Sequence, residues 1–410
     1  MKKCILLLLV LAAFSCTDTE KKSNSDLDSV FNKLSEEYLK GYLDWRPQYG
    51  VYYGFHEYDG KATDFSKASI AAEVTRLKYY DAKLAELDSA SLSIKTYYDW
   101  KMLGSSIKNE LFSFEDLQVY TKNPMTYADA VNVNIYIKRN FAPLEQQIKS
   151  IIAIENQVPK MYEDAKANLL DTLAIPHTQL AIEIARGTAS FLEKDLLVSL
   201  KDVKNDSLMK EFETANKKAI DAINGFASYL EKEKLPKAIN NYAIGKENYQ
   251  KMLLFGENIT LSADAILAIG IKELQKEQSS FNAAAKIINP NKKPIDVYND
   301  LQKEHPTAES LIPDSKKNLE TIRQFILDNK IVTIPSEVRV KLEETPPFAR
   351  ATSTASMDTP GPYETKATEA YYYITPVDPK WTPIQHALDL EKWHGLKNQR
   401  TYSRAFEENK

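Results

Sequence analysis

Residues 212–230 read FETANKKAIDAINGFASYL and carry the clearest structural signal in this chain. The apolar side chains at Phe212, Ala219, Ile223, Phe226 and Leu230 recur at intervals of three, four or seven residues. This spacing places them on one face of an α-helix, while charged residues between them fall on the other face. The stretch therefore predicts a long amphipathic helix with one side against a protein core.

Similar spacing recurs along most of the chain, and we expect further helices at residues 27–38, 74–87, 94–111, 144–158, 262–288 and 314–329. Asp26 and Ser262 stand at expected N-caps, Asp314 opens the last of these helices, and Pro159 begins one more. The 410 residues include only 12 glycines, and 43% are hydrophobic. Few glycines and many helix-forming residues favour helices over a turn-rich sandwich of sheets.

The hydrophobic period changes after Lys330. Residues 331–334 form a short β-prone run, residues 338–342 alternate apolar and charged side chains, and residues 369–375 are a third strand candidate. We therefore predict a mainly α fold, consisting of a multi-helix body with a small β-sheet near the C-terminus.

The first fifteen residues have the features of a secretory signal peptide. Two lysines follow Met1, and Ile5 to Ala13 form an uninterrupted apolar run shortly before Cys16. This run is too short to serve as a transmembrane helix of the mature chain. The sequence from Ala13 to Cys16 is similar to a bacterial lipobox, so residues 1–15 are expected to be removed and Cys16 to be lipidated.

A lipidated Cys16 would attach the protein to a membrane of the bacterial envelope, because two acyl chains give stable anchoring. The alternative is a plain secreted protein with an unused cysteine. Residues 16–26 have the polar, charged composition of a flexible tether, and a folded domain is expected from Leu27. Cys4 leaves with the signal peptide, so the mature chain keeps one thiol and has no internal disulfide.

The charge balance argues against nucleic acid as a partner. The chain carries 53 Lys and Arg against 57 Asp and Glu, and the two signs are interspersed. A mildly acidic protein of this kind lacks the electrostatic attraction that binding to a phosphate backbone requires. We predict no nucleic-acid partner.

No stretch of the chain contains a complete catalytic motif. Helical zinc hydrolases use two histidines four residues apart with a glutamate between them, and none of the five histidines has this spacing. His56 lacks a second ligand and is expected to be a hydrogen-bonded surface residue. His386 and His394 are eight residues apart, which separates them by about 12 Å on a helix, too far for one zinc ion. The chain also lacks a Gly-x-Ser-x-Gly nucleophile elbow and a glycine-rich phosphate loop.

Three residues near the C-terminus are candidates for the wall of a cleft. In a strand, Tyr371 and Tyr373 point to one side and Tyr372 to the other, so one face can pack while the other lines a cleft. Packing in the core is the simpler alternative for these tyrosines. Arg350 could bind a substrate carboxylate through two hydrogen bonds, although a structural ion pair would explain it equally well. We assign no catalytic residue and no metal ligand.

Four blocks of the sequence are similar to successive blocks of one bacterial family. They are residues 49–59 (YGVYYGFHEYD), 140–144 (NFAPL), 244–249 (IGKENY) and 348–381. From about residue 27 to about residue 383, the chain resembles the family called domain of unknown function 885. The resemblance implies an exported lipoprotein with a mostly helical, zincin-like fold and the chemistry of a zinc metallopeptidase.

The family's metal motif, His-Glu-Ala-x-Pro-Gly-His-His, does not occur in residues 384–410, where the resemblance places it. The tail diverges after Pro383, and we expect a gene that is truncated or frame-shifted before the motif. This chain would then bind no zinc, unlike full-length members, and would be inactive as a peptidase. Helices that lose their partners in this way would expose apolar faces and make the chain poorly soluble.

The sequence therefore predicts an exported lipoprotein, held through Cys16 at the periplasmic or outer-membrane face of the envelope, with a peptidase-like but inactive domain at residues 27–383. Two alternatives remain open. The protein could be a non-catalytic lipoprotein that binds peptides in a helical cleft, or a structural lipoprotein of the envelope.

Overall fold

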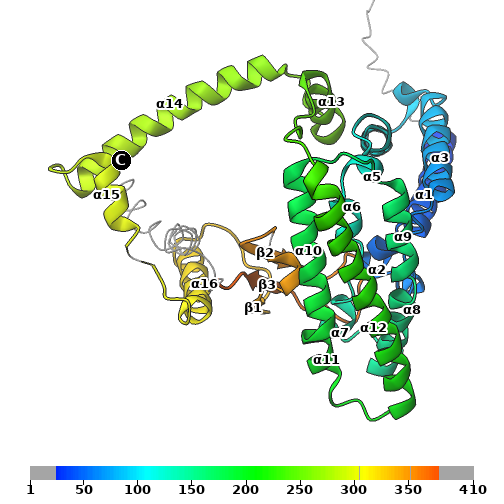
Figure 1. The fold of residues 1–410 in the computed structure, drawn as a ribbon. Helices are drawn as coiled ribbons and strands as arrows, with labels where there is room; N and C mark the ends of the chain where they lie inside the picture. The colour runs from blue at the N-terminus through cyan, green and yellow to red at the C-terminus, as the bar shows by residue number, and fades with distance from the viewer. Residues whose placement is uncertain (1–24, 304, 351, 378–410) are drawn as a thin grey trace, which may run out of the picture.

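The computed structural model describes residues 25–303, 305–350 and 352–377. Most of these residues are helical, and a three-stranded sheet lies near the C-terminal end of the described chain (Figure 1). The predicted mainly α fold with a small sheet is thus confirmed. The predicted signal peptide, Cys16, most of the tether, and the tail with His386 and His394 lie outside the described residues.

Helices near the N-terminus form one side of the body. They are α1 (Ser25–Trp45), α2 (Pro47–Tyr53), α3 (Lys67–Ala85) and α4 (Ile94–Leu111). Ser66 and Ser93 cap α3 and α4, because their hydroxyl oxygens accept hydrogen bonds from the first backbone N–H groups of these helices. The apolar faces of α1, α3 and α4 enclose a small core of buried residues that includes Phe31, Tyr38, Leu77 and Ile107.

The central helices form the main hydrophobic core. They are α8 (Leu144–Glu155), α9 (Val158–Asn168), α10 (Ile175–Glu193) and α12 (Asp206–Tyr229). α12 lies against the other three (Figure 1). The five residues that predicted this helix are all fully buried: Phe212, Ala219, Ile223, Phe226 and Leu230. Burial of a Phe, Ile or Leu side chain stabilises a fold by about 1.5–3 kcal/mol, so this face accounts for the position of α12.

Short helical turns connect the longer helices. They are η1 (His56–Tyr58), η2 (Ser89–Ser91), η3 (Phe112–Asp116), α5 (Val119–Lys122), α6 (Met125–Ala128), α7 (Ile135–Lys138), α11 (Asp195–Leu200), η4 (Leu230–Lys234) and η5 (Leu235–Lys237). Pro159 lies in the first turn of α9, as predicted, where its missing N–H leaves no helical hydrogen bond unmade.

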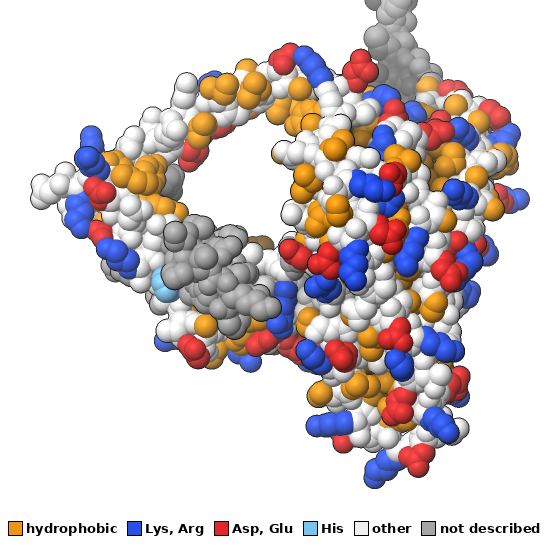
Figure 2. All heavy atoms as spheres, in the orientation of Figure 1, with side chains coloured by type: hydrophobic (Ala, Val, Ile, Leu, Met, Phe, Trp, Pro, Cys, Tyr) orange, Lys and Arg blue, Asp and Glu red, His pale blue; other side chains and the backbone are white. Residues whose placement is uncertain are grey.

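After η5 the chain leaves the body through an arm. The arm consists of α13 (Lys246–Glu257), α14 (Ala263–Ile288), α15 (Pro294–Leu301) and α16 (Leu311–Asp328). α13 lies against α4, whereas α14 leads away from the body, and Figure 2 shows an opening between arm and body. Ser262 caps α14, as predicted, by accepting a hydrogen bond from the N–H of Ala265 at 3.1 Å. α16 begins before the predicted Asp314, because Thr307 and Ser310 exchange hydrogen bonds that set an earlier helix start.

The arm exposes many apolar side chains. Within α14 only Ala285 is buried. Leu267, Ile271 and Leu274 share one face of this helix and are 62%, 48% and 56% exposed. Apolar patches follow the arm in Figure 2. The described residues therefore leave an apolar surface of the arm uncovered, although none of the helices they form is long and apolar enough to cross a membrane.

The sheet contains β1 (Lys341–Glu344), β2 (Ala355–Asp358) and β3 (Tyr371–Ile374) in the order β1-β3-β2. β3 pairs in parallel with β1 and antiparallel with β2, so that Tyr371 lies between Lys341 and Asp358. The predicted strand at 369–375 is confirmed, and the one at 338–342 begins later than expected.

Two strand predictions differ from the structure. Residues 331–334 form no strand, because Ile331 and Val332 lie on the exposed surface without a neighbouring strand to pair with. β2 was not predicted, because its four residues, Ala-Ser-Met-Asp, include no β-branched or aromatic side chain of the kind that favours strands. Its pairing with β3 determines its conformation.

Side chains of the body hold the sheet in place. The guanidinium of Arg139, just after α7, donates hydrogen bonds to the carboxylate of Asp358 at 2.7 Å and to the carbonyl oxygen of Glu369 at 2.5 Å. A second contact is made by η6 (Pro347–Ala349), which lies against α10. There Phe348 packs edge-on against Phe191, with ring centroids 5.4 Å apart. The segment after the arm therefore returns to the central helices.

Candidate functional site

A cleft of about 790 Å³ opens between α1, α2, the end of α4 and the segment from Val119 to Asn132. Six aromatic side chains line it: Tyr42, Trp45, Tyr49, Tyr52, Phe65 and Tyr120. Its amide groups come from Gln48, Asn123 and Asn132, and its charged groups from Arg46, Glu110 and Asp129. We call this space the aromatic cleft. It combines a large apolar wall with a few polar groups, as ligand sites commonly do.

A bend between α1 and α2 positions the aromatic wall. Pro47 starts α2, where its fixed φ suits a new first turn. Across the bend, the rings of Tyr42 and Tyr49 lie 6.1 Å apart, and Tyr49 stacks on Tyr53 at 6.2 Å. At the end of α4, the π-helical turn η3 brings Ser113 to the cleft, and such turns occur often at functional sites.

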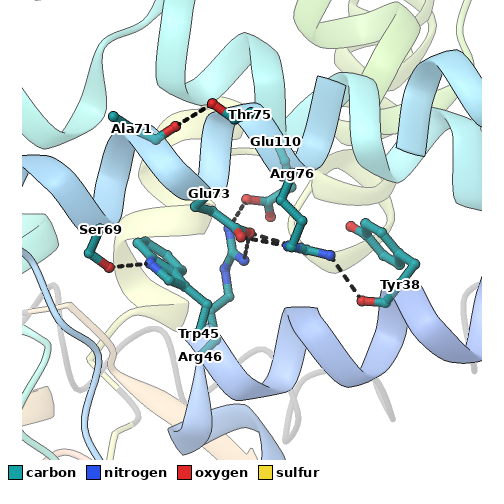
Figure 3. Close-up of polar contacts among 9 residues, drawn as sticks. All are labelled: Tyr38, Trp45, Arg46, Ser69, Ala71, Glu73, Thr75, Arg76 and Glu110. Atoms are coloured by element: carbon teal, nitrogen blue, oxygen red, sulfur yellow. Dashed lines mark hydrogen bonds and ion pairs between the residues drawn. The ribbon is translucent and has the colours of Figure 1, made fainter. Parts of the chain in front are cut away.

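A buried ion-pair cluster supports one side of the cleft (Figure 3). The guanidinium of Arg46 donates to the carboxylate of Glu73 at 2.8 Å and also pairs with Glu110. Arg76 binds the same Glu73 through two hydrogen bonds of 2.7 and 2.9 Å. Two cations and two anions are thus brought together, so that the cluster as a whole is neutral.

The pKa values of the two carboxylates in this cluster are shifted in opposite directions. Burial acts to raise the pKa of Glu73, but its hydrogen bonds to Arg76 and Arg46 outweigh that effect and hold the pKa below its ordinary value. Among the described residues Glu110 forms an ion pair only with Arg46, and burial raises its pKa above the ordinary value. Arg46 also lies over the rings of Tyr42 and Trp45, 4.4 and 4.6 Å from their centroids. The aromatic wall therefore already accommodates one cation.

Asp129 is the remaining charged group of the cleft. Its side chain has no hydrogen bond or ion pair to any other described residue, and it is exposed to solvent. The surrounding protein nevertheless displaces bulk water, and this desolvation raises the pKa of Asp129 above its ordinary value. Burial is the largest cause that raises the pKa of Tyr49; the charge of Glu110 and, less strongly, Tyr53 and Asp129 raise it further, and Arg46 lowers it. Asp129 therefore acts electrostatically on the aromatic wall.

A second cleft, of about 250 Å³, adjoins the aromatic cleft and reaches the sheet. Both are lined by Gln48, Tyr52 and Asn132. The smaller cleft is also lined by Phe348 and by Ser356, Met357 and Asp358 of β2. Together the two spaces form a continuous surface from α1 to an edge of the sheet.

The structure places the three candidate wall residues differently. Tyr373 is buried and lines the smaller cleft. Tyr371 lines neither cleft, and its hydroxyl donates a hydrogen bond to the carbonyl oxygen of Lys138 at 2.8 Å. Arg350 also lines neither cleft, because its guanidinium binds the carbonyl oxygen of Thr345 at 2.7 Å and pairs with Glu344 at 3.2 Å. Arg350 thus makes the structural ion pair that was its alternative interpretation.

His56 is hydrogen-bonded, as expected from the sequence. Its Nδ1 lies 3.3 Å from Asp59, its Nε2 lies 3.0 Å from Glu364, and its ring stacks on Phe141 at 3.9 Å. Because the two carboxylates contact opposite ring nitrogens, the three side chains do not converge on one point. In the described part of the chain, no group of three His, Cys, Asp or Glu side chains is arranged to hold a metal ion. Residues 384–410, where the resemblance places the zinc motif, lie outside the described residues.

The sequence prediction missed the aromatic cleft itself. Its signal was present in the run Tyr42, Trp45, Tyr49 and Tyr52, which recurs every three or four residues like an ordinary helix face. Such a stripe usually packs into a core. Here the chain bends at Arg46, and residues distant in sequence, such as Asn132, lie opposite. The aromatic stripe therefore lines an open cleft.

Comparisons with known proteins agree with this fold. A solved structure from Shewanella oneidensis, described as "a putative lipoprotein of unknown function", is similar to this chain with a TM-score of 0.65. The match covers 88% of this chain and 67% of that one, at 21% sequence identity. At this identity the likeness supports the fold alone. No curated protein matches the chain.

A family model shows the relationship of the sequence more directly. The model of a family described as "Bacterial protein of unknown function (DUF885)" matches residues 47–398. The match spans most of the 410 residues and includes the four blocks that suggested the same family. The chain therefore belongs to the DUF885 family of bacterial proteins of unknown function.

Proposed function

We propose that this protein is a lipoprotein of the bacterial envelope, anchored through Cys16, that binds peptides in the aromatic cleft and the smaller cleft beside it. The apolar run before Cys16 and the lipoprotein description of the Shewanella oneidensis protein support the anchor. The large aromatic wall and its few amide groups support the binding of an organic ligand.

The position of β2 is the observation that carries the choice of a peptide. β2 is an edge of the sheet, and three of its four residues line the smaller cleft: Ser356, Met357 and Asp358. An edge strand has backbone N–H and C=O groups that no neighbouring strand of the sheet satisfies, and an extended peptide can pair with them. Side chains of such a peptide could reach the aromatic cleft across Tyr52, which lines both spaces.

The anchor is tested by replacing one cysteine at a time. Cys16→Ala should move the protein from the membrane fraction to the soluble fraction and abolish labelling by a radioactive fatty acid. Cys4→Ala is the matched control, because Cys4 lies in the predicted signal peptide and should have no effect. Unchanged membrane attachment of Cys16→Ala would refute the anchor.

Peptide binding is tested by titrating the full chain with a mixture of random pentapeptides, followed by individual peptides that bind. Tyr52→Ala should weaken binding about tenfold, because it removes the side chain shared by both clefts. Tyr98→Ala on α4 is the control, since Tyr98 is also an exposed tyrosine but lines neither cleft. N-methylation of the peptide backbone should also weaken binding if β2 pairs with it.

The zinc peptidase chemistry that the resemblance implies is tested with the same samples. Metal content and peptide cleavage are measured together with binding. Stoichiometric zinc accompanied by cleavage would make hydrolysis, and not binding alone, the function of this chain. Binding without cleavage in a chain supplied with zinc would support the proposed binding function.

A further inference from the structure

Among the residues that the structure describes, the lining of the aromatic cleft carries one negative charge without an ion-pair partner. Its charged lining consists of Arg46, Glu110 and Asp129. Arg46 and Glu110 belong to the neutral cluster with Glu73 and Arg76, so their charges are already compensated. Asp129 has no ion pair with any described residue. An open site with a single unpaired carboxylate attracts cations more strongly than neutral or anionic groups.

The aromatic wall also favours a cationic ligand. The faces of Tyr, Trp and Phe rings attract cations through the negative charge of their π-electrons. Tyr49 and Tyr52 are 49% and 45% exposed, so their rings remain accessible to a ligand. On the buried side of the same wall, Arg46 already lies over Tyr42 and Trp45. The wall therefore already holds a guanidinium of the protein itself over two of its rings.

The cleft also has room for the apolar part of a basic side chain. Lysine and arginine carry a flexible apolar stem that packs well on aromatic surfaces while the charged end reaches a polar partner. A volume of about 790 Å³ accommodates such a side chain together with a short segment of backbone. Asp129 and the exposed ring of Tyr49 then provide the two contacts that such a side chain requires.

From these observations we infer that the aromatic cleft selects a basic side chain, lysine or arginine, of the bound peptide. Asp129 pairs with its charge, and Tyr49 and Tyr52 cover its stem. This inference rests on the proposed peptide-binding function and adds a specificity to it. Asp129 is a specificity-determining residue in this arrangement, whereas Arg46 and Glu110 shape the wall.

The test compares two peptides that differ in one side chain. Acetylated and amidated pentapeptides with a central lysine or a central glutamine, and alanine elsewhere, are titrated into the full chain by calorimetry. The protein should bind the lysine peptide about tenfold more tightly, and added salt should reduce this preference. Asp129→Asn should bind both peptides with the affinity that the wild type shows for the glutamine peptide.

Glu163→Gln is the matched control, because Glu163 is an exposed acid on α9 that lines neither cleft. This variant should keep the full preference for lysine. Because Asp129 is exposed, its replacement should leave the thermal unfolding midpoint unchanged, which separates lost binding from lost folding.

The outcomes distinguish the inference from the function on which it rests. Equal binding of both peptides by the wild type, or a lysine preference that survives in Asp129→Asn, would overturn the charge selectivity and leave peptide binding intact. If the wild type binds neither these peptides nor any in the random mixture, the proposed function fails, and the inference fails with it.

Discussion

The Nε2 atom of His56 lies 3.0 Å from the carboxylate of Glu364, although 308 positions separate the two residues in sequence. Two further contacts lie beside the contact between His56 and Glu364. The backbone N–H of Tyr363 donates to the carbonyl oxygen of Tyr53 at 2.9 Å, and the ring of Tyr363 stacks on Phe55 at 4.6 Å. The first and last of the four sequence blocks that resemble the family therefore meet in space.

His56→Ala should destabilise this junction, because it leaves the buried carboxylate of Glu364 without its side-chain donor. Burial acts to raise the pKa of Glu364, but hydrogen bonds from the N–H groups of Lys366 and Ala367 and from His56 bring it below its ordinary value. A lowered pKa in the folded state stabilises the protein above the pKa of the unfolded state, and this stabilisation is lost as the pH falls.

We therefore expect His56→Ala to lower the free energy of unfolding by about 1–3 kcal/mol at neutral pH, and by less in acid. Urea unfolding at both pH values measures the difference. His56→Gln should lose less, since its amide can still donate to Glu364. A loss for His56→Ala that is equally large in acid would contradict this account.

Gly361→Ala should destabilise the same junction by steric overlap. An added Cβ would lie 2.3 Å from the carbonyl oxygen of Tyr52 and 2.4 Å from the carbonyl carbon of Tyr53, both rigid backbone atoms. We expect a loss of about 2–4 kcal/mol in the free energy of unfolding. Gly225→Ala in α12 is the matched control, because its Cβ meets no atom within 4 Å and alanine favours helices by about 0.5–1 kcal/mol. Thermal or urea unfolding should give opposite signs for the two variants.

Arg46→Met should be strongly destabilising. It keeps much of the side-chain volume but leaves Glu110 without its arginine and Glu73 with one arginine in place of two. Removing one partner from a buried ion-pair cluster costs about 3–5 kcal/mol, which urea unfolding can measure. Lys217→Ala, which breaks the exposed pair with Asp221, should have little effect. Similar losses for both variants would show that the cluster behaves like a surface ion pair.

Glu155 should make the stability depend on pH. Neither of its carboxyl oxygens has a hydrogen-bond partner among the described residues, and burial raises its pKa from 4.5 to about 8. Between these values the folded protein binds a proton that the unfolded chain releases, so the free energy of unfolding falls as the pH rises from about 4.5 to about 8. Glu155→Gln cannot ionise and should exceed the wild type by roughly 2–4 kcal/mol near pH 8.

The measurement for Glu155 is urea unfolding across this pH range. The slope of stability against pH should become flatter in Glu155→Gln. Glu145→Gln on the same helix is the control, because Glu145 is exposed, and it should retain the slope of the wild type. Identical slopes for all three proteins would show that Glu155 is already ionised in the fold.

Replacement of Leu267, Ile271 and Leu274 by glutamine should make the recombinant chain more soluble. These side chains are already exposed, so their replacement removes an apolar surface without opening a cavity. Light scattering should show less self-association, while the thermal unfolding midpoint changes little. The buried Ala285 provides the contrast, because Ala285→Gln in the same helix should lower that midpoint. A wild type that is already monodisperse would contradict the prediction.

The sequence was most informative where structure depends on neighbours a few residues away. The helix over residues 212–230, the cap at Ser262 and the strand at Tyr371 to Ile374 could all be predicted from residue types and spacing within a few positions. β2 could not be predicted in this way, because its pairing with β3 is long-range. The predicted strand at residues 331–334 was wrong for the same reason, since a β-prone segment forms no strand without a neighbouring strand to pair with.

By itself, then, the sequence determined a helical protein of the DUF885 family with a small C-terminal sheet. Hydrophobic periodicity and family motifs depend only on the order of residues along the chain. Only the tertiary structure decided that Arg46 pairs with Glu73 and Glu110, while Asp129 has no ion pair within the described part of the chain. The environment of a charge depends on which distant side chains the packing brings beside it. For that reason the residues that line the aromatic cleft could be identified only from the packing of the helices.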